Sequence, residues 1–134
     1  MAVKGIHHLG VAVEDLAGAA ALYARLFGAE LERREELPDQ GVDVASLRVG
    51  DSHIELLSPL AADTPVGRFL AGRGPGMHHV AFAVEDVGAE LVRLRAGGAE
   101  LVDDEPRPGA FGTTVAFVHP NAAGGVLAEL VSDG

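Results

Sequence analysis

A histidine pair occurs twice in this sequence, each time inside nearly the same run of residues. The runs are "GIHHLGVAVED" at 5–15 and "GMHHVAFAVED" at 76–86. Successive side chains of a strand point to opposite faces, so one histidine of each pair joins a row of bulky apolar residues. The other histidine is followed on its face only by small residues. His8 and His79 are therefore expected to face open space above a sheet.

A glutamate recurs near the end of each repeat as well. "IELLS" at 54–58 matches "AELVS" at 128–132, and both carboxylates lie between apolar neighbours. Burying such a carboxylate is costly unless it is paired or bound to a cation. If a pseudo-twofold axis relates the repeats, two imidazoles and two carboxylates meet in a site suited to divalent cobalt, nickel, manganese, iron or zinc. The candidate metal ligands are His8, Glu55, His79 and Glu129.

The remaining histidines are expected to have other roles. His7 and His78 share the apolar face and are predicted to be structural. His53 has no counterpart in the second repeat, which favours a surface role. His119 lies in the turn "FVHPNAAGGV", where it either shapes the turn or contacts a substrate.

Caps and turn signals predict the elements that position these residues. The first repeat should contain a strand at 5–13, a helix capped by Asp15 and closed by Gly28, and strands at 29–35, 42–50 and 52–58. The second should contain a strand at 76–84, a helix capped by Asp86 and ending at Gly97 and Gly98, and strands near 99–104, 112–119 and 125–132. A short helix from Pro65, capped by Asp63 or Thr64, is expected between them.

The internal duplication sets the fold class. We expect an α+β protein in which two paired βαβββ modules form a curved, cleft-bearing mixed sheet. A length of 134 residues suits a single domain over 1–134, made of repeats at about 4–60 and 75–133.

Composition limits the partners. The net charge of −10 opposes binding to nucleic acid, and the longest apolar runs fall well short of the roughly 20 residues that cross a bilayer. Cysteine is absent, which is compatible with a reducing cytoplasm and leaves His, Asp, Glu and amides as metal ligands. We therefore expect a cytoplasmic protein with no nucleic-acid or membrane partner.

The paired units with a histidine and a glutamate from each half resemble the vicinal oxygen chelate superfamily. Within it, the sequence resembles the methylmalonyl-CoA epimerase family over essentially the whole chain. The motifs that carry this resemblance are "HHLGVAVED", "DTPVGRFL", "GMHHVAFAVED", "DEPRPGAFGTTVAFVHP" and "GGVLAEL".

The resemblance implies a homodimeric enzyme that interconverts (2R)- and (2S)-methylmalonyl-CoA, with a small-molecule acyl-CoA as substrate. It places the metal ligands on His8, His79 and Glu129, with Glu55 at a position that is often glutamine in relatives. It implies a divalent ion, with cobalt as the first choice and nickel, manganese or zinc as alternatives. The cations available for the coenzyme A moiety are Arg33, Arg34, Arg68, Arg73 and Arg107.

One departure from the family bears on mechanism. Some members carry a proposed catalytic glutamate in the strand after "QGV", where this chain has Val44. The hypothesis is then that Glu55 and Glu129 are the catalytic carboxylates, acting on opposite faces of the substrate carbon. A lactoylglutathione lyase of the glyoxalase I type, or a metal-free small-molecule binding protein of the same fold, are the alternatives.

Overall fold

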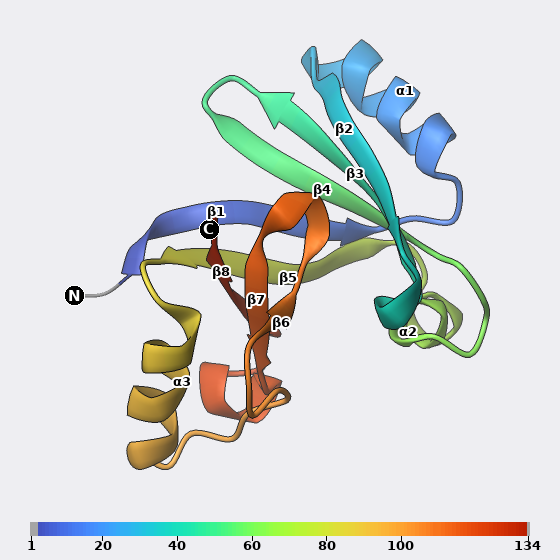
Figure 1. Ribbon diagram of the computed structural model, residues 1–134. Coiled ribbons are helices and arrows are strands. Elements are labelled where there is room, and N and C mark those ends of the chain that lie inside the picture. Colours follow the sequence, from blue (N-terminus) through green and yellow to red (C-terminus); the bar gives the residue numbers. More distant parts are fainter. Residues whose placement is uncertain (1–2, 134) are drawn as a thin grey trace. The chain divides into compact units, whose positions relative to one another are not determined.

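The computed structural model describes residues 3–133, which form two compact units. Unit 1 joins the residues before His8 to those after His78, and unit 2 comprises His8–His78. Strand β1 (Val3–Ala12) and strand β5 (Gly76–Val84) each begin in one unit and end in the other. Both units follow the expected order of a strand, a helix and three further strands (Figure 1).

Unit 2 is built on a sheet of four strands in the order β2-β3-β4-β1. Its elements after β1 are α1 (Leu16–Phe27), β2 (Glu30–Leu37), the 3-10 helix η1 (Pro38–Gln40), β3 (Val42–Val49), β4 (Ser52–Pro59) and α2 (Pro65–Arg73). Strands β1 and β4 run parallel, and β2-β3 and β3-β4 are antiparallel. The start of α1 packs on one face of this sheet, where Leu16 joins a core with Val11, Val13 and Leu56.

Unit 1 repeats this plan with shorter strands in the order β5-β8-β7-β6. Its elements after β5 are α3 (Val87–Ala96), β6 (Arg107–Pro108), the 3-10 helix η2 (Ala110–Gly112), β7 (Thr114–Val118), the 3-10 helix η3 (Pro120–Ala123) and β8 (Ala128–Ser132). Strands β5 and β8 are parallel, whereas β8-β7 and β7-β6 are antiparallel. Val87 and Leu91 of α3 pack with Val84 and Leu130 in the core of this unit.

The helix ends lie where the caps predict them. The Asp15 carboxylate accepts the amide of Gly18 at 3.2 Å, and Gly28 ends α1 with φ 68°. Asp86 accepts the amide of Ala89 at 3.0 Å at the start of α3. Of the two caps predicted for α2, the structure has Thr64, whose hydroxyl accepts the amide of Gly67 at 3.0 Å. Within residues 3–133, no helix has both the length and the apolar character that crossing a bilayer requires.

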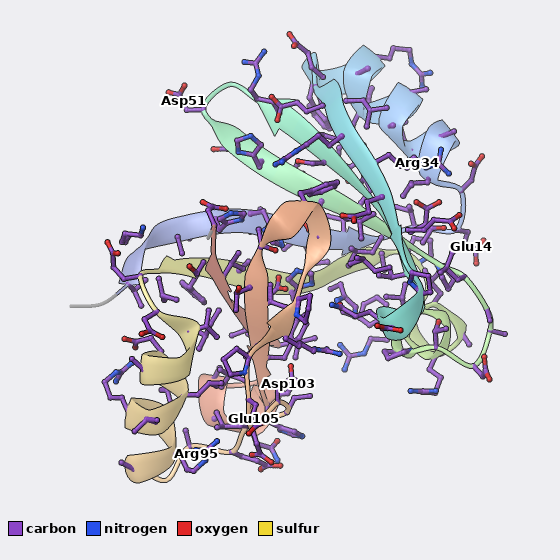
Figure 2. The ribbon with its side chains drawn as sticks, viewed as in Figure 1. Glu14, Arg34, Asp51, Arg95, Asp103 and Glu105 are labelled. Atoms are coloured by element: carbon purple, nitrogen blue, oxygen red, sulfur yellow. The ribbon has the colours of Figure 1, made fainter. Side chains whose placement is uncertain are left out.

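The strand predicted near 99–104 is wrong. Leu101 alone forms an isolated bridge, to Val118, and the chain resumes pairing only at the two-residue strand β6. The amides of Val102 and Asp103 both donate to the Phe117 carbonyl. The Asp103 carboxylate accepts the backbone amide of Phe117 at 2.8 Å, where a continued strand would place a backbone carbonyl. Prolines at 106 and 108 also lack the amide that a longer strand would need. Figure 2 shows Asp103 and Glu105 in this segment, which follows Arg95 and the end of α3.

Candidate metal centre

The first histidine–glutamate pair lies entirely within unit 2. The parallel register of β1 and β4 places Gly10 opposite Glu55, two residues beyond His8 on the same face. Because glycine has no side chain, the Glu55 carboxylate can turn toward the imidazole, and the distance from His8 Nδ1 to Glu55 Oε2 is 3.2 Å. The His8 side chain is 3% exposed and that of Glu55 is 12% exposed. The face predicted for both residues is confirmed.

The second pair repeats this geometry within unit 1. Ala81 of β5 is opposite Glu129 of β8, and Ala81 again follows the histidine by two residues. His79 Nε2 lies 3.1 Å from Glu129 Oε1, and both side chains are less than 10% exposed. The edge of the His79 ring also meets the Phe117 ring, with 5.5 Å between centroids. The structure thus gathers the four predicted ligands as two matching pairs, one in each unit.

Each pair offers one nitrogen and one oxygen donor in a buried setting. Ligand atoms of these types lie about 2.1 Å from a bound zinc ion. Two such atoms at right angles about the ion would be about 3.0 Å apart, close to the nitrogen–oxygen distances of 3.2 and 3.1 Å. Imidazole and carboxylate together suit the divalent first-row metals. The donor set therefore fits a divalent ion.

The other histidines each contact a residue outside the four predicted ligands. His7 Nε2 lies 2.9 Å from Asp133 near the end of the described chain, and the His78 ring packs edge-on against Phe69. His53 pairs with Glu32 at 3.0 Å in a partly exposed position. His119 shapes the turn after β7, because its Nδ1 accepts the amide of Asn121 at 3.0 Å.

The outer strand of unit 1 brings a cation to the face that carries Glu129. Phe117 is paired with Glu129 across β7 and β8, and the Arg107 guanidinium carbon lies 5.8 Å from the centre of the Phe117 ring. Asp103 fixes this arginine from its other side, with Oδ2 3.4 Å from Nε. From the sequence, Arg107 is only one of five arginines available for the coenzyme A moiety. Its position depends on Phe117 and Asp103, to which the sequence alone assigns no role.

Arg34, another of those five cations, is paired with a carboxylate of its own unit. Its guanidinium donates two hydrogen bonds to Asp43, at 3.3 and 2.8 Å. The hydrogen bonds and the charge of Asp43 raise the pKa of Arg34 above its ordinary value. Figure 2 labels Arg34, which belongs to strand β2 of unit 2.

Comparison with known proteins matches this description. The model of the glyoxalase/bleomycin resistance protein/dioxygenase superfamily matches residues 7–117. The ethylmalonyl-CoA/methylmalonyl-CoA epimerase of Cereibacter sphaeroides is 40% identical over 128 residues, which cover 93% of this chain and 95% of that protein.

Solved structures agree with the sequence matches. The methylmalonyl-CoA epimerase from Mycobacterium tuberculosis is 39% identical, with a TM-score of 0.94 over 98% of this chain and 89% of that one. A variant of the Streptomyces coelicolor methylmalonyl-CoA epimerase, in complex with 2-nitronate-propionyl-CoA, is 37% identical, with a TM-score of 0.95 over 98% of this chain and 99% of that one. The fold expected from the sequence, that of the vicinal oxygen chelate proteins, is confirmed. The chain belongs to the glyoxalase/bleomycin resistance protein/dioxygenase superfamily and, within it, to the methylmalonyl-CoA epimerase family.

Proposed function

We propose that this protein interconverts (2R)- and (2S)-methylmalonyl-CoA with the help of a divalent metal ion. The observation that carries the proposal is the duplicated buried pair of His8 with Glu55 and His79 with Glu129, in a chain of the epimerase family. A buried carboxylate beside an imidazole is costly to maintain without a charge partner. Its occurrence at matching positions of both repeats is better explained by a shared ligand than by packing.

We propose that all four side chains bind one ion. Its identity follows the order given by the resemblance, with cobalt first and nickel, manganese or zinc as alternatives. When bound, the ion supplies a Lewis acid that stabilises negative charge developing on the thioester oxygen.

The reaction requires proton transfer at a carbon that lies between a thioester and a carboxylate. A base removes the proton from one face, and an acid returns a proton to the other face. The simplest scheme assigns these tasks to Glu55 and Glu129. Their equivalent positions in the two repeats make approach from opposite faces reasonable, and each already lies beside a histidine that can hold its orientation.

Deuterium incorporation tests the function. Cobalt-loaded protein is incubated with (2R)- or (2S)-methylmalonyl-CoA in deuterated water, and both the deuterium content at the second carbon and the epimer ratio are followed. Exchange accompanied by epimerisation, above the rate without protein and abolished by a chelator, is the expected result. Neither exchange nor epimerisation would contradict the proposal, and a hemithioacetal of methylglyoxal would then be the comparison substrate. Full activity of Glu55→Gln would contradict the simplest scheme alone.

We also propose that the protein acts in the cytoplasm as a homodimer. The family resemblance and the absence of cysteine support this proposal. Light scattering coupled to size-exclusion chromatography should give twice the chain mass of 13.8 kDa. A mass of one chain at micromolar concentration would contradict the dimer.

A further inference from the structure

A third carboxylate, that of Glu35, lies on the same face of the unit 2 sheet as Glu55. In the antiparallel ladder Glu35 is opposite Val44, and Ser46 is opposite Glu55. Directly opposed residues of antiparallel strands share a face, and so do residues two apart on one strand. Val44 and Ser46 are two apart, so Glu35 and Glu55 lie on the same face in successive cross-strand rows.

The other face of the same strands confirms this assignment. Ala45 and Leu47 of β3 belong to the core that includes Leu16 of α1. Arg34 and Asp43, which alternate with Glu35 and Val44, bond to each other at 2.8 Å on that helix-covered face. Glu35 must therefore point to the face that carries the candidate metal ligands.

Glu35 is more buried than the other charged residues of β2. Glu36, the next residue, is exposed, whereas Glu35 is half-buried. Its cross-strand neighbour Val44 is only 2% exposed and is shorter than a glutamate. Leu57 of β4 lies directly beyond Val44, and Glu55 lies two residues further along the same face of β4.

The proposed reaction would be simpler with a carboxylate that transfers protons without binding the metal ion. In the simplest scheme both proton carriers are metal ligands, so each must release the ion in order to accept a proton. A carboxylate outside the donor set avoids this requirement on one side of the substrate. It needs only to reach the reacting carbon directly or through one water.

We propose that Glu35 is the catalytic proton carrier on the unit 2 side of the substrate, which leaves Glu55 as a ligand. This inference rests on the proposed epimerase function and refines its simplest scheme. In one direction, the Glu35 carboxylate accepts the proton from the second carbon, and the bonding electron pair enters the thioester enolate. The protonated carboxyl of Glu129 then delivers its proton to the opposite face of that carbon. Proton exchange of both carboxyls with water restores the starting state.

The test compares Glu35→Gln with Glu36→Gln, a matched substitution at the exposed neighbouring position. Both metal-loaded variants are given each epimer separately in deuterated water, after metal content and melting temperature are shown to match the unaltered protein. Glu36→Gln should behave as the unaltered protein does. Glu35→Gln should lose epimerisation by about a hundredfold or more, the usual effect of a positioned acid or base.

Exchange without epimerisation is the decisive signature. With Glu35 replaced, Glu129 can still remove the proton of one epimer and return deuterium to the same face. One epimer should therefore keep exchanging with retained configuration, and the other should not. Glu35→Asp should recover part of the epimerisation, because it restores a carboxylate.

The opposing outcomes are distinct. Epimerisation by Glu35→Gln within about threefold of the unaltered protein, far less than a lost acid or base would cost, would overturn the role of Glu35 and leave the epimerase function standing. Loss of exchange with both epimers would also overturn it, since a one-sided carrier cannot have that effect. Absence of epimerisation by the unaltered protein would instead remove the proposed function, and this inference with it.

Discussion

The two histidine–glutamate pairs lead us to expect that one divalent ion binds each chain and stabilises the fold. The donor atoms of the pairs are already 3.2 and 3.1 Å apart, so metal binding requires little rearrangement within either unit. An ion present at a hundred times its dissociation constant adds about 2.7 kcal/mol to the free energy of unfolding. For a chain of 134 residues, each kcal/mol raises the melting temperature by about 3–5 °C. The expected rise is therefore about 8–13 °C.

A cobalt titration measures this effect. Protein stripped with a chelator receives cobalt stepwise, and both the melting temperature and the bound cobalt per chain are recorded. Glu55→Gln and Glu129→Gln each remove one charged donor, and each should weaken binding at the same single site by about tenfold or more, or about 1.4 kcal/mol. Asp51→Asn, at the exposed tip of the β3-β4 hairpin (Figure 2), serves as the control and should titrate as the unaltered protein does.

The number of cobalt ions bound per chain distinguishes one shared site from two separate sites. Two ions per chain, one of which survives in each glutamate variant, would show that the pairs are separate sites. A melting temperature that cobalt does not change would show that the buried pairs serve the fold alone. Either result would refute the shared centre on which the proposed function depends.

Single substitutions test the residues that surround the candidate site. Thr64→Ala removes the cap of α2 and should cost about 1 kcal/mol, a fall in melting temperature of about 3–5 °C, whereas Asp63→Ala, at an exposed neighbour, should leave the melt unchanged. Leu56→Ala opens a cavity behind Glu55 and should lower the unfolding free energy by about 3 kcal/mol in a denaturant titration. Arg107→Met should raise KM for the anionic substrate by about tenfold with a smaller change in kcat. An unaltered KM would exclude this cation from substrate binding.

The sequence predicts most of the fold because its signals are local. Asp15, Asp86 and Thr64 each satisfy backbone amides at a helix start, and a capping residue needs only its own turn to do so. The inner strands are equally clear, because His8 and His79 stand in alternating apolar runs whose two faces can be separated on paper. These are the strands that hold the candidate ligands, so the faces of those ligands could be predicted along with them.

The outer strands escape prediction for physical reasons. Residues 32–36 are five consecutive charged residues, so no alternation separates their faces. The ladder also shifts register between Leu31 and Arg33, and such a bulge turns every later side chain to the opposite face. The orientation of Glu35 therefore becomes visible only in the paired structure. In unit 1 the side chain of Asp103, which no pattern distinguishes, accepts the Phe117 amide that a strand at 99–104 would have paired with a backbone carbonyl.

The two repeats agree at the four proposed metal ligands and differ on their outer strands. Glu35 is opposite Val44 in unit 2, and Arg107 is opposite Val115 at the equivalent place in unit 1. A carboxylate thus occupies the position that a cation occupies in the other repeat. Methylmalonyl-CoA is itself asymmetric, with an exchangeable proton on one carbon and a permanent anion beside it. The proposed metal site needs only the equivalent inner strands, whereas the proposed roles of Glu35 in proton transfer and of Arg107 in anion binding depend on the difference between the outer strands.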